Sequence, residues 1–345
     1  VIDNVEDESV IQAVSEEVST VLVGNEPIIE RLTIAALTGG HVLLEGVPGV
    51  AKTTIADLFA RALGLDFRRI QMTPDILPAD ITGTQMYREQ TGEFQVQRGP
   101  VFANLVLADE INRATPKTQS ALLEAMQERQ VTIEGETLTL PTPFMVVATQ
   151  NPIEYEGTFA LPEAQRDRFQ FKLVVDVPEA GDERTMLNRF DDEPGLGPES
   201  VSQVVEPDAL LAARREVEEV HVSPKVKEYI LSVISATRTA SDIEYGASPR
   251  TSLMLLNAGK AHAAIRGREY ALPADIKAIV PDVLRHRLVL NTDAVLSDRS
   301  IESVVDDILG MTPAPEAQLD VPQPDEQSLA GGETAGAEAT EGADD

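Results

Sequence analysis

Short apolar runs alternate with amphipathic stretches through the first half of the chain. Helical periodicity, with apolar residues recurring every three or four positions, is found over 26–37 and 53–63. Five runs have the pattern of buried strands, at 41–45, 67–72, 105–108, 144–148 and 171–175. This alternation predicts an α/β fold with a mainly parallel, five-stranded sheet and helices on both faces. Phosphate-binding groups are expected at the carboxyl ends of such strands.

Two hairpins interrupt this alternation. Residues 84–96 predict a hairpin that turns at Thr91-Gly92, and residues 131–140 predict a second one around Glu134-Gly135. Thr115 followed by Pro116 has the pattern of a helix start, and that helix is expected to run to about residue 129.

The pattern changes after the fifth strand. Residues 183–204 are rich in acid, Gly and Pro, which predicts a link to a second domain. The region after it is helical in pattern and includes the segments 226–239, 250–266 and 273–283. The predicted organisation is an acidic, helical lead-in (1–20), an α/β core (21–182), a linker (183–204), a small all-α domain (205–311) and a disordered acidic tail (312–345).

A candidate P-loop follows the first strand. Backbone N–H groups of such a turn converge on an anion, Lys52 would reach the β- and γ-phosphates, and the Thr53 hydroxyl would ligate Mg²⁺. The segment comprises Gly46, Val47, Pro48, Gly49, Val50, Ala51, Lys52, Thr53 and Thr54. The consensus has glycine before the lysine, and Ala51 fits there if its φ is negative. Taken alone, the segment could be an ordinary strand-to-helix turn.

A second signal for nucleotide hydrolysis lies at two other strand ends. Asp109 directly follows a buried run and is predicted to anchor Mg²⁺ through metal-bound water, with Glu110 polarising the attacking water. An ordinary acidic helix start is the simpler alternative for this pair. Asn151 follows the 144–148 run, and its amide would orient the water if the two strands are neighbours.

Two segments supply arginines for the γ-phosphate. A short helix within 161–169 carries Arg166 and Arg168, and Phe169 is a predicted core anchor that would fix the direction in which Arg168 leaves the chain. Arg250 opens a helix in the second domain, where positive charge opposes the helix dipole and favours a nearby anion. Solvated surface charge is the alternative for each of them.

Together these motifs resemble the MoxR family of AAA+ ATPases over roughly residues 18–311. The motifs are 46–53, the Asp109–Arg113 segment, Thr149 to Pro152, 161–169 and Ser248-Pro249-Arg250. The resemblance implies a Walker A lysine at Lys52, Walker B acids at Asp109 and Glu110, sensor 1 at Asn151, an arginine finger at Arg168 and sensor 2 at Arg250. Arg166 departs from the apolar residue usual there, so the choice of finger between Arg166 and Arg168 stays open.

The same resemblance implies further features. The 84–96 hairpin resembles the helix-2 insert of this clade, 131–140 its pre-sensor-1 hairpin, and Val23-Gly24-Asn25 the segment that lines the adenine pocket. It also implies a ring, usually a hexamer, with ATP between subunits. The expected role is chaperone-like remodelling or metal-centre assembly of client proteins, often with a von Willebrand factor A-domain partner.

Composition narrows the function further. The formal net charge is −30, and only seven of the 28 basic residues are lysines, a balance typical of a high-salt cytoplasm such as that of a halophilic archaeon. An acidic surface that recruits a basic partner is the alternative. Broad nucleic-acid contact is disfavoured because phosphates would meet like charge. The chain has no cysteine and no apolar stretch of membrane-spanning length, so we expect a cytoplasmic protein without membrane insertion.

The leading hypothesis is therefore an ATP-hydrolysing ring that remodels protein clients, with ATP and Mg²⁺ as cofactors. A motor acting on DNA is the first alternative, and a nucleotide-switched scaffold without turnover is the second. A small-molecule kinase fits least well, because Arg168, Asn151 and the helical domain would then have no purpose.

Overall fold

The fold is built around a five-stranded sheet, seen in a computed structural model that describes residues 10–90, 92–153 and 157–315. All five strands are parallel and lie in the order β2-β5-β8-β1-β9. Their bounds are β1 Val42–Glu45, β2 Phe67–Gln71, β5 Leu105–Asp109, β8 Met145–Gln150 and β9 Phe171–Val174. The predicted α/β class and the five strands are confirmed.

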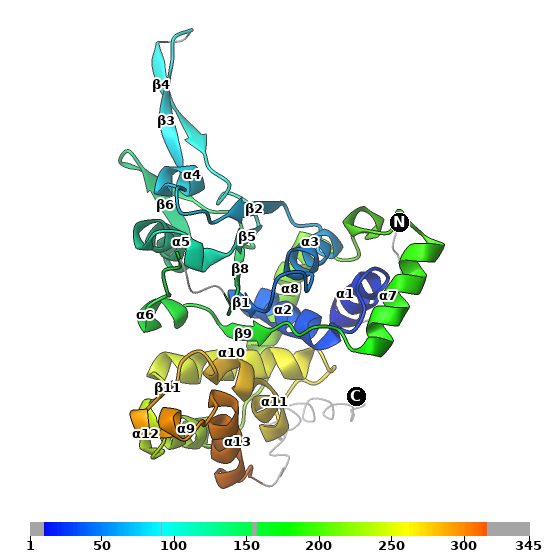
Figure 1. Cartoon of the computed structure of the whole chain (residues 1–345), viewed down its shortest axis with the longest axis vertical. Coiled ribbons are helices and arrows are strands. Elements are labelled where there is room, and N and C mark those ends of the chain that lie inside the picture. The colour runs from blue at the N-terminus through cyan, green and yellow to red at the C-terminus, as the bar shows by residue number, and fades with distance from the viewer. Residues whose placement is uncertain (1–9, 91, 154–156, 316–345) are drawn as a thin grey trace, which may run out of the picture. The chain divides into compact units, whose positions relative to one another are not determined.

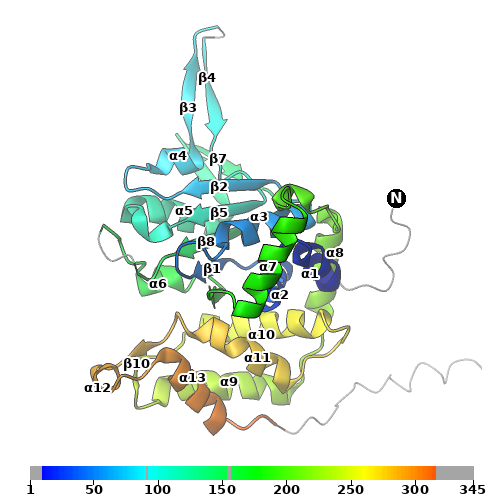
Figure 2. The same cartoon turned by 45° about the vertical axis from the view of Figure 1, so that its right-hand side comes forward.

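Successive residues of the central strands point to opposite faces of the sheet, each of which is covered. Leu43, Val106 and Val146 belong to one buried cluster, with α5 (Pro116–Glu128). Leu44 and Leu107 belong to a second cluster, with α1 (Val10–Ser19), α2 (Glu26–Thr38) and α3 (Lys52–Ala62). Figure 2 shows α5 on one side of the stacked strands and α2 and α3 on the other.

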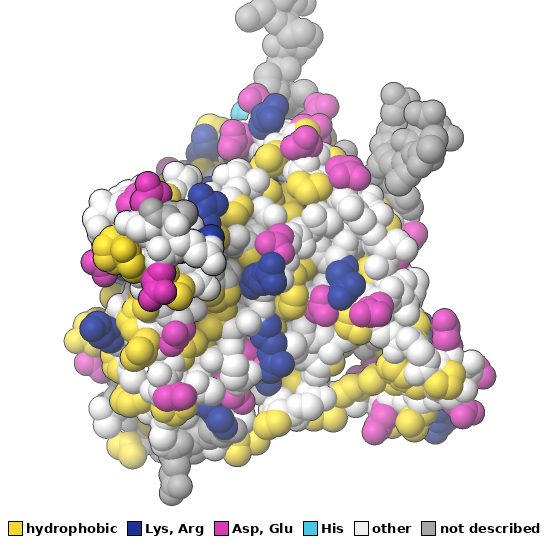
Figure 3. Space-filling model, turned by 90° about the horizontal axis from the view of Figure 1, so that it is seen from above, with side chains coloured by type: hydrophobic (Ala, Val, Ile, Leu, Met, Phe, Trp, Pro, Cys, Tyr) yellow, Lys and Arg dark blue, Asp and Glu magenta, His cyan; other side chains and the backbone are white. Residues whose placement is uncertain are grey.

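Both predicted hairpins are present. The first pairs β3 (Gly83–Arg88) with β4 (Glu93–Arg98) after the short helix α4 (Pro78–Thr82), and it projects away from the sheet (Figure 1). Its apolar side chains Met86, Tyr87 and Phe94 are exposed. On the face seen along this hairpin, acidic and basic side chains are interspersed (Figure 3).

The second hairpin joins β6 (Gln130–Ile133) to β7 (Glu136–Thr139) and directly follows α5. The predicted start of α5 is also confirmed. The Thr115 side chain accepts a hydrogen bond from the Thr118 N–H, and Pro116 is the first helical residue.

Beyond β9 the chain is mostly helical. Its helices are α7 Ala180–Asp192, α8 Pro207–Glu219, α9 Pro224–Thr239, α10 Pro249–Ala264, α11 Pro273–Leu284, α12 Thr292–Leu296 and α13 Ile301–Met311. A short antiparallel pair, β10 (Ile243–Tyr245) and β11 (Val289–Leu290), lies among them. The segment predicted to be a linker contains most of α7, and a 3-10 turn at Pro198–Ser200 follows it.

The helical region packs directly on the α/β region, and we call it the lid. Arg31 of α2 donates hydrogen bonds to Asp282 and to the Ala278 carbonyl of α11, and Arg214 of α8 donates to the Ala36 carbonyl. One hydrophobic cluster includes residues of both regions, and the two regions form one compact unit. The predicted domain boundaries stay predictions. The predicted tail lies outside the described residues from 316 onward, as do residues 1–9 of the lead-in.

None of the helices in the described part of the chain has both the length and the apolar character that crossing a lipid bilayer requires.

Candidate active site

The predicted P-loop connects the end of β1 to the start of α3. Gly46 approaches β9 so closely that a Cβ there would lie 2.5 Å from the Val175 carbonyl oxygen, and Gly49 has a left-handed φ of 88°. Ala51, directly before the helix, is also left-handed, with φ 61° and ψ 20°. The condition set for Ala51, a negative φ, is therefore not met, and alanine occupies the position in a left-handed conformation. Consecutive residues of opposite backbone hand turn their N–H groups toward one point, and that requirement overrides the steric preference of alanine.

Lys52 and Thr53 begin α3 at this point. The Lys52 ammonium donates to the carbonyl oxygens of Gly46 (2.5 Å) and Val47 (2.9 Å). The Thr53 hydroxyl lies 3.5 Å from Asp109 Oδ2, and Thr54 follows half-buried on the same helix. The lysine thus folds back over its own loop, where a phosphate would compete with these carbonyls for its charge.

Asp109 is the last residue of β5 and is almost fully buried. The Thr149 hydroxyl, on β8, donates to its Oδ1 at 2.6 Å. Arg69, on β2, donates to its Oδ2 from Nε at 3.0 Å and from Nη2 at 2.5 Å. A buried carboxylate beside a threonine hydroxyl is the kind of oxygen donor set that Mg²⁺ takes, so Thr53 and Asp109 fit the predicted metal site. In this structure the positively charged group paired with Asp109 is the guanidinium of Arg69.

Glu110 sits one residue beyond the strand in a left-handed conformation, with φ 59°. Its N–H donates to the Thr149 hydroxyl at 2.8 Å. Its Oε2 accepts a hydrogen bond from the Gln71 amide at 2.8 Å and lies 3.3 Å from Arg113 Nε. A non-glycine residue held in this region costs about 1–3 kcal/mol, and such strain is concentrated at functional sites.

Asn151 lies beside the P-loop, because β8 and β1 are neighbours. Gln150 pairs with Glu45, and the Gly46 N–H donates to the Gln150 carbonyl at 3.3 Å. Asn151 itself is buried, and its side-chain carbonyl accepts from the Ile153 N–H at 3.1 Å. The expected neighbour relation between the strands that carry Asp109 and Asn151 is confirmed by the β5–β8 pairing.

Val23 and Gly24 lie in the turn between α1 and α2. Gly24 has φ 76°, and a Cβ there would lie 2.3 Å from Asp182 Oδ2 on α7. The same helix is tied to the end of α1 through Arg189, which donates to the carbonyls of Ser19 and Thr20. The role of this turn at the adenine stays a prediction.

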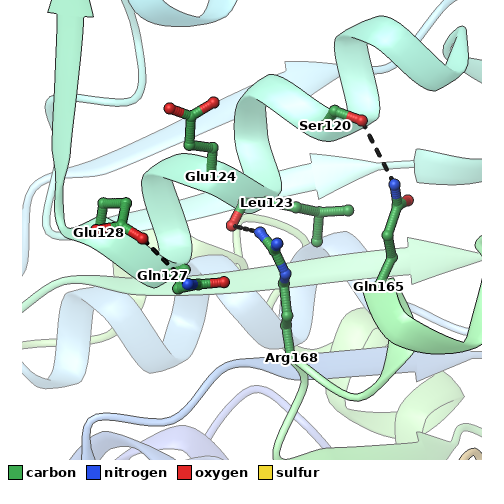
Figure 4. A pocket seen from close by; sticks show the side chains of 7 residues that line it. All are labelled: Ser120, Leu123, Glu124, Gln127, Glu128, Gln165 and Arg168. Atoms are coloured by element: carbon green, nitrogen blue, oxygen red, sulfur yellow. Dashed lines mark hydrogen bonds between the residues drawn. The ribbon is translucent and has the colours of Figure 1, made fainter.

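The two predicted phosphate-sensing arginines are at the other end of the sheet. β9 runs parallel to β1, with Phe171 opposite Val42 and Val174 opposite Glu45. The P-loop follows Glu45 at the edge where the strands end, which we call the carboxyl edge. Arg168 precedes Phe171 at the edge where they begin, the amino edge. Its guanidinium donates to the Leu123 carbonyl of α5, and it lines an open pocket on that helix (Figure 4).

Arg250 is held near the same edge. It is exposed in the first turn of α10, two residues after Ser248, whose hydroxyl lies 3.5 Å from Asp167 Oδ2. Arg166, the alternative finger, belongs to α6 (Glu163–Arg166), and its Nε is buried without a hydrogen-bond partner among the described residues. The structure thus brings together Lys52, Thr53, Asp109, Glu110 and Asn151, and it places Arg166, Arg168 and Arg250 elsewhere.

The amino edge also holds two buried imidazoles. Burial lowers the pKa of His41 to about 4, with Arg129, Arg250 and Arg214 adding to the effect and a hydrogen bond to the Met126 carbonyl opposing it. Burial also lowers the pKa of His286, and the charge of Arg287 adds to it. Both rings are therefore neutral at pH 7, and the arginines around them favour that neutral form.

Sequence reasoning missed Arg69 and Gln71, the β2 residues that contact the two predicted Walker B acids. One signal was present. Positions 69 and 71 are two apart on a predicted strand, so both side chains point to the same side, and both are polar. The missing information was that β2 lies beside β5.

Comparisons with known proteins agree with this geometry. Residues 41–171 match the family described as "ATPase family associated with various cellular activities (AAA)", and residues 235–308 match "AAA lid domain". A crystal structure of a putative ATPase from Cytophaga hutchinsonii is similar, with a TM-score of 0.82 and 42% identity, over 89% of this chain and 95% of that one.

Three named relatives extend the comparison over the lid. Chaperone MoxR1 of Mycobacterium tuberculosis is 46% identical over 316 residues, 89% of this chain and 82% of the relative. The uncharacterized protein YeaC of Bacillus subtilis is 43% identical over 300 residues (87% and 93%), and the protein MoxR of Paracoccus denitrificans is 33% identical over 293 (79% and 86%). Because these relatives are matched along most of their length, the chain belongs to the MoxR family of AAA+ ATPases.

Proposed function

We propose that this ATPase works as a ring of identical subunits, a hexamer, that binds ATP between neighbours and remodels client proteins. This proposal rests on one observation: the predicted site residues of a single subunit are divided between the two edges of its sheet. The Walker residues and Asn151 are at the carboxyl edge, whereas Arg168 and Arg250 are near the amino edge of the same subunit. A second subunit whose amino edge faces the first one's carboxyl edge would complete the site.

In the proposed mechanism each residue has one task. The P-loop N–H groups and Lys52 bind the phosphates, and Thr53 and Asp109 hold Mg²⁺, which when bound neutralises phosphate charge. Glu110 takes the proton of the attacking water, and Asn151 orients that water. Arg168 and Arg250 of the neighbour stabilise charge on the γ-phosphate as it is transferred.

Two observations support a protein client. The relative from Mycobacterium tuberculosis is named a chaperone. The β3–β4 hairpin exposes Met86, Tyr87 and Phe94, and a group of exposed apolar side chains on a projecting element is typical of a protein-binding surface. Assembly or metal insertion in the client, and a von Willebrand factor A-domain partner, are the finer parts of this proposal.

The test is ATP turnover per subunit as a function of protein concentration, in Mg²⁺ and near-molar KCl. We expect a steep rise, because sites form only between subunits, and a loss of at least 10³-fold in Arg168→Ala with ATP binding retained. Arg184→Ala, which removes an exposed arginine of α7, is the control. A measurable rate that does not depend on concentration, and that survives Arg168→Ala, would contradict the shared site.

A further inference from the structure

Arg287 is a buried arginine of the lid, and four of its hydrogen bonds go to one short segment of the core. Its other contacts, with the Val283 carbonyl, His286 Nε2 and Met254 Sδ, stay within the lid. Its side chain is 2% exposed and lies just beyond the end of α11. It donates from Nε to Asp167 Oδ1 at 2.8 Å, from Nη2 to the carbonyls of Phe169 (2.5 Å) and Asp167 (3.2 Å), and from Nη1 to the Gln170 carbonyl at 3.2 Å. Every one of these acceptors belongs to residues 167–170.

Burying a charged guanidinium in this way costs free energy. Burial lowers the pKa of Arg287 to about 10, and the Asp167 carboxylate opposes that shift, so the guanidinium remains charged at neutral pH. Replacing water around a charge is tolerated only where its donors all find partners. The planar fork of arginine matches a row of oxygens better than a lysine ammonium does. The geometry therefore specifies an arginine at this position.

The segment that Arg287 holds contains the predicted finger. Arg168 lies between Asp167 and Phe169, and the Phe169 side chain is fully buried in the core. The Gln170 N–H donates to the His41 carbonyl at 2.7 Å, which ties the end of the segment to β1. The core thus anchors one end, and the lid supplies the hydrogen bonds to the backbone on both sides of Arg168.

We propose that Arg287 is a positioning residue for the arginine finger, through which the lid of a subunit sets the direction of its own Arg168. The inference rests on the proposed role of Arg168 in the neighbour's site. It adds that the lid and the segment around the finger are coupled, so that a lid displaced by its nucleotide state changes the direction of the finger in the adjacent site. Arg287 itself touches no substrate and acts only through residues 167–170.

A structural role is the competing explanation, and the chain offers a matched control for it. Arg31 is also a poorly exposed arginine that bridges core and lid, with bonds of 2.8 Å to both Asp282 Oδ2 and the Ala278 carbonyl. None of these contacts involves the finger segment. If Arg287 only holds the lid in place, removing Arg31 and removing Arg287 should have similar consequences.

The experiment is complementation between subunits. Acceptor subunits carry Arg168→Ala and keep their Walker residues, and donor subunits carry Glu110→Gln and keep their finger. Each alone is expected to be inactive, and an equimolar mixture should hydrolyse ATP at sites that combine an acceptor's Walker residues with a donor's finger. Donors with a second change, Arg287→Lys, Arg287→Ala or Arg31→Ala, are then compared at equal incorporation into the assembly, with their melting temperatures measured alongside.

We expect donors with Arg287→Lys or Arg287→Ala to restore at least tenfold less turnover than plain donors, because small misplacement of a catalytic group is costly. The loss should fall on kcat, with the ATP KM of the acceptor sites unchanged, and Arg31→Ala donors should restore full turnover. Equal rescue by Arg287→Lys donors, which keep the charge and the fold, would overturn the inference. So would an equal loss in Arg31→Ala donors. No rescue by plain donors would instead overturn the finger assignment and the shared site on which the inference rests.

Discussion

The two edges of the central sheet are built differently, although the same strands form both. At the carboxyl edge two non-glycine residues, Ala51 and Glu110, are held in left-handed conformations, and Lys52 binds carbonyls of its own loop. At the amino edge His41 and Arg287 are buried among fixed backbone partners. The contrast teaches that groups at the carboxyl edge can exchange their hydrogen-bond partners for a ligand, whereas the buried groups at the amino edge have partners that the fold fixes.

The physical basis is the kind of partner available at each edge. Asp109 and Glu110 are paired with the side chains of Arg69 and Gln71, which can rotate away when a metal ion or nucleotide arrives. The amino-edge groups are bonded mainly to the main chain: His41 to the Val146 N–H of β8 and Arg287 to carbonyls of the turn that precedes β9. Changes at the carboxyl edge should therefore alter chemistry with little effect on stability, whereas removing a buried amino-edge group such as His41 should lower stability.

The largest expected effect is that of Glu110→Gln. Loss of the carboxylate that we propose as the base for water should lower ATP turnover by about 10²–10⁴-fold, with ATP binding retained. The free energy of unfolding should change by less than about 1 kcal/mol, because the carboxylate is held only by side chains at the surface of the site. Turnover and denaturant unfolding check the two halves of this prediction.

Glu136→Gln, an exposed change on β7, is the control for the loss of one negative charge. Normal hydrolysis in Glu110→Gln would remove this residue from the mechanism. A large loss of stability would break the comparison between the edges, since it would make Glu110 part of the scaffold.

The carboxyl edge was largely predictable because its signals are local. A strand, a glycine-containing turn and Lys52-Thr53 lie within a dozen residues, and Asp109-Glu110 directly follows its own apolar run. The hairpins and the Thr115 cap were predictable for the same reason. The conformation of Ala51 was not, because the demand for converging N–H groups overrides alanine's own preference there.

The amino edge was not predictable, because its contacts are distant in sequence. Arg287 and Asp167 are 120 residues apart, and although Asp167 stands in the 161–169 motif, nothing in that motif points to Arg287. Arg69 was missed at the other edge for a related reason: its contact with Asp109 depends on strand order, which periodicity does not contain. Pairs of this kind follow from topology, so a single sequence offers no pattern that marks them.

The amino edge should also make stability depend on pH. The pKa of His41 is about 4 in the folded protein and about 6.5 in an unfolded chain, so the unfolded state binds its proton first as the pH falls. Its contribution is complete above pH 6.5 and is lost as the pH falls to about 4, by on the order of 3 kcal/mol in total. In His41→Gln the free energy of unfolding should be lower at pH 7 and should fall less steeply over this window.

Denaturant unfolding of wild type and variant between pH 7 and 4 measures that difference, and the many carboxylates cancel in the comparison. His221→Gln, which removes an exposed imidazole, controls for the loss of any histidine. If the free energy of unfolding falls equally steeply with pH in wild type and His41→Gln, the buried ring does not contribute to the pH dependence of stability.

At the carboxyl edge, Arg69→Ala should increase the affinity for Mg²⁺. At the proposed metal site the guanidinium would compete with Mg²⁺ for the same oxygen of Asp109. Its removal should therefore raise Mg²⁺ affinity about fivefold, on the order of 1 kcal/mol for a pair whose arginine is half exposed. Titration of Mg²⁺ against nucleotide binding in a Glu110→Gln background measures this without turnover. Arg68→Ala, at the adjacent and more exposed arginine, is the matched control and should leave the titration unchanged. Weaker Mg²⁺ binding in Arg69→Ala would make the arginine a helper of the metal rather than its competitor.

The smallest expected effect is a gain in stability when the left-handed alanine of the carboxyl edge is replaced by glycine. Ala51→Gly should stabilise the protein by about 0.5–1 kcal/mol, because left-handed alanine costs about 1–2 kcal/mol and glycine recovers most of it after its larger loss of chain entropy. The same change at Ala212, exposed on α8, should destabilise by about 1 kcal/mol, as glycine does in a helix. Denaturant unfolding measures both. A gain in stability at Ala51 with a loss at Ala212 would mean that the backbone of the P-loop is strained at Ala51. A loss of stability at both positions would mean that the left-handed conformation of Ala51 carries no such strain.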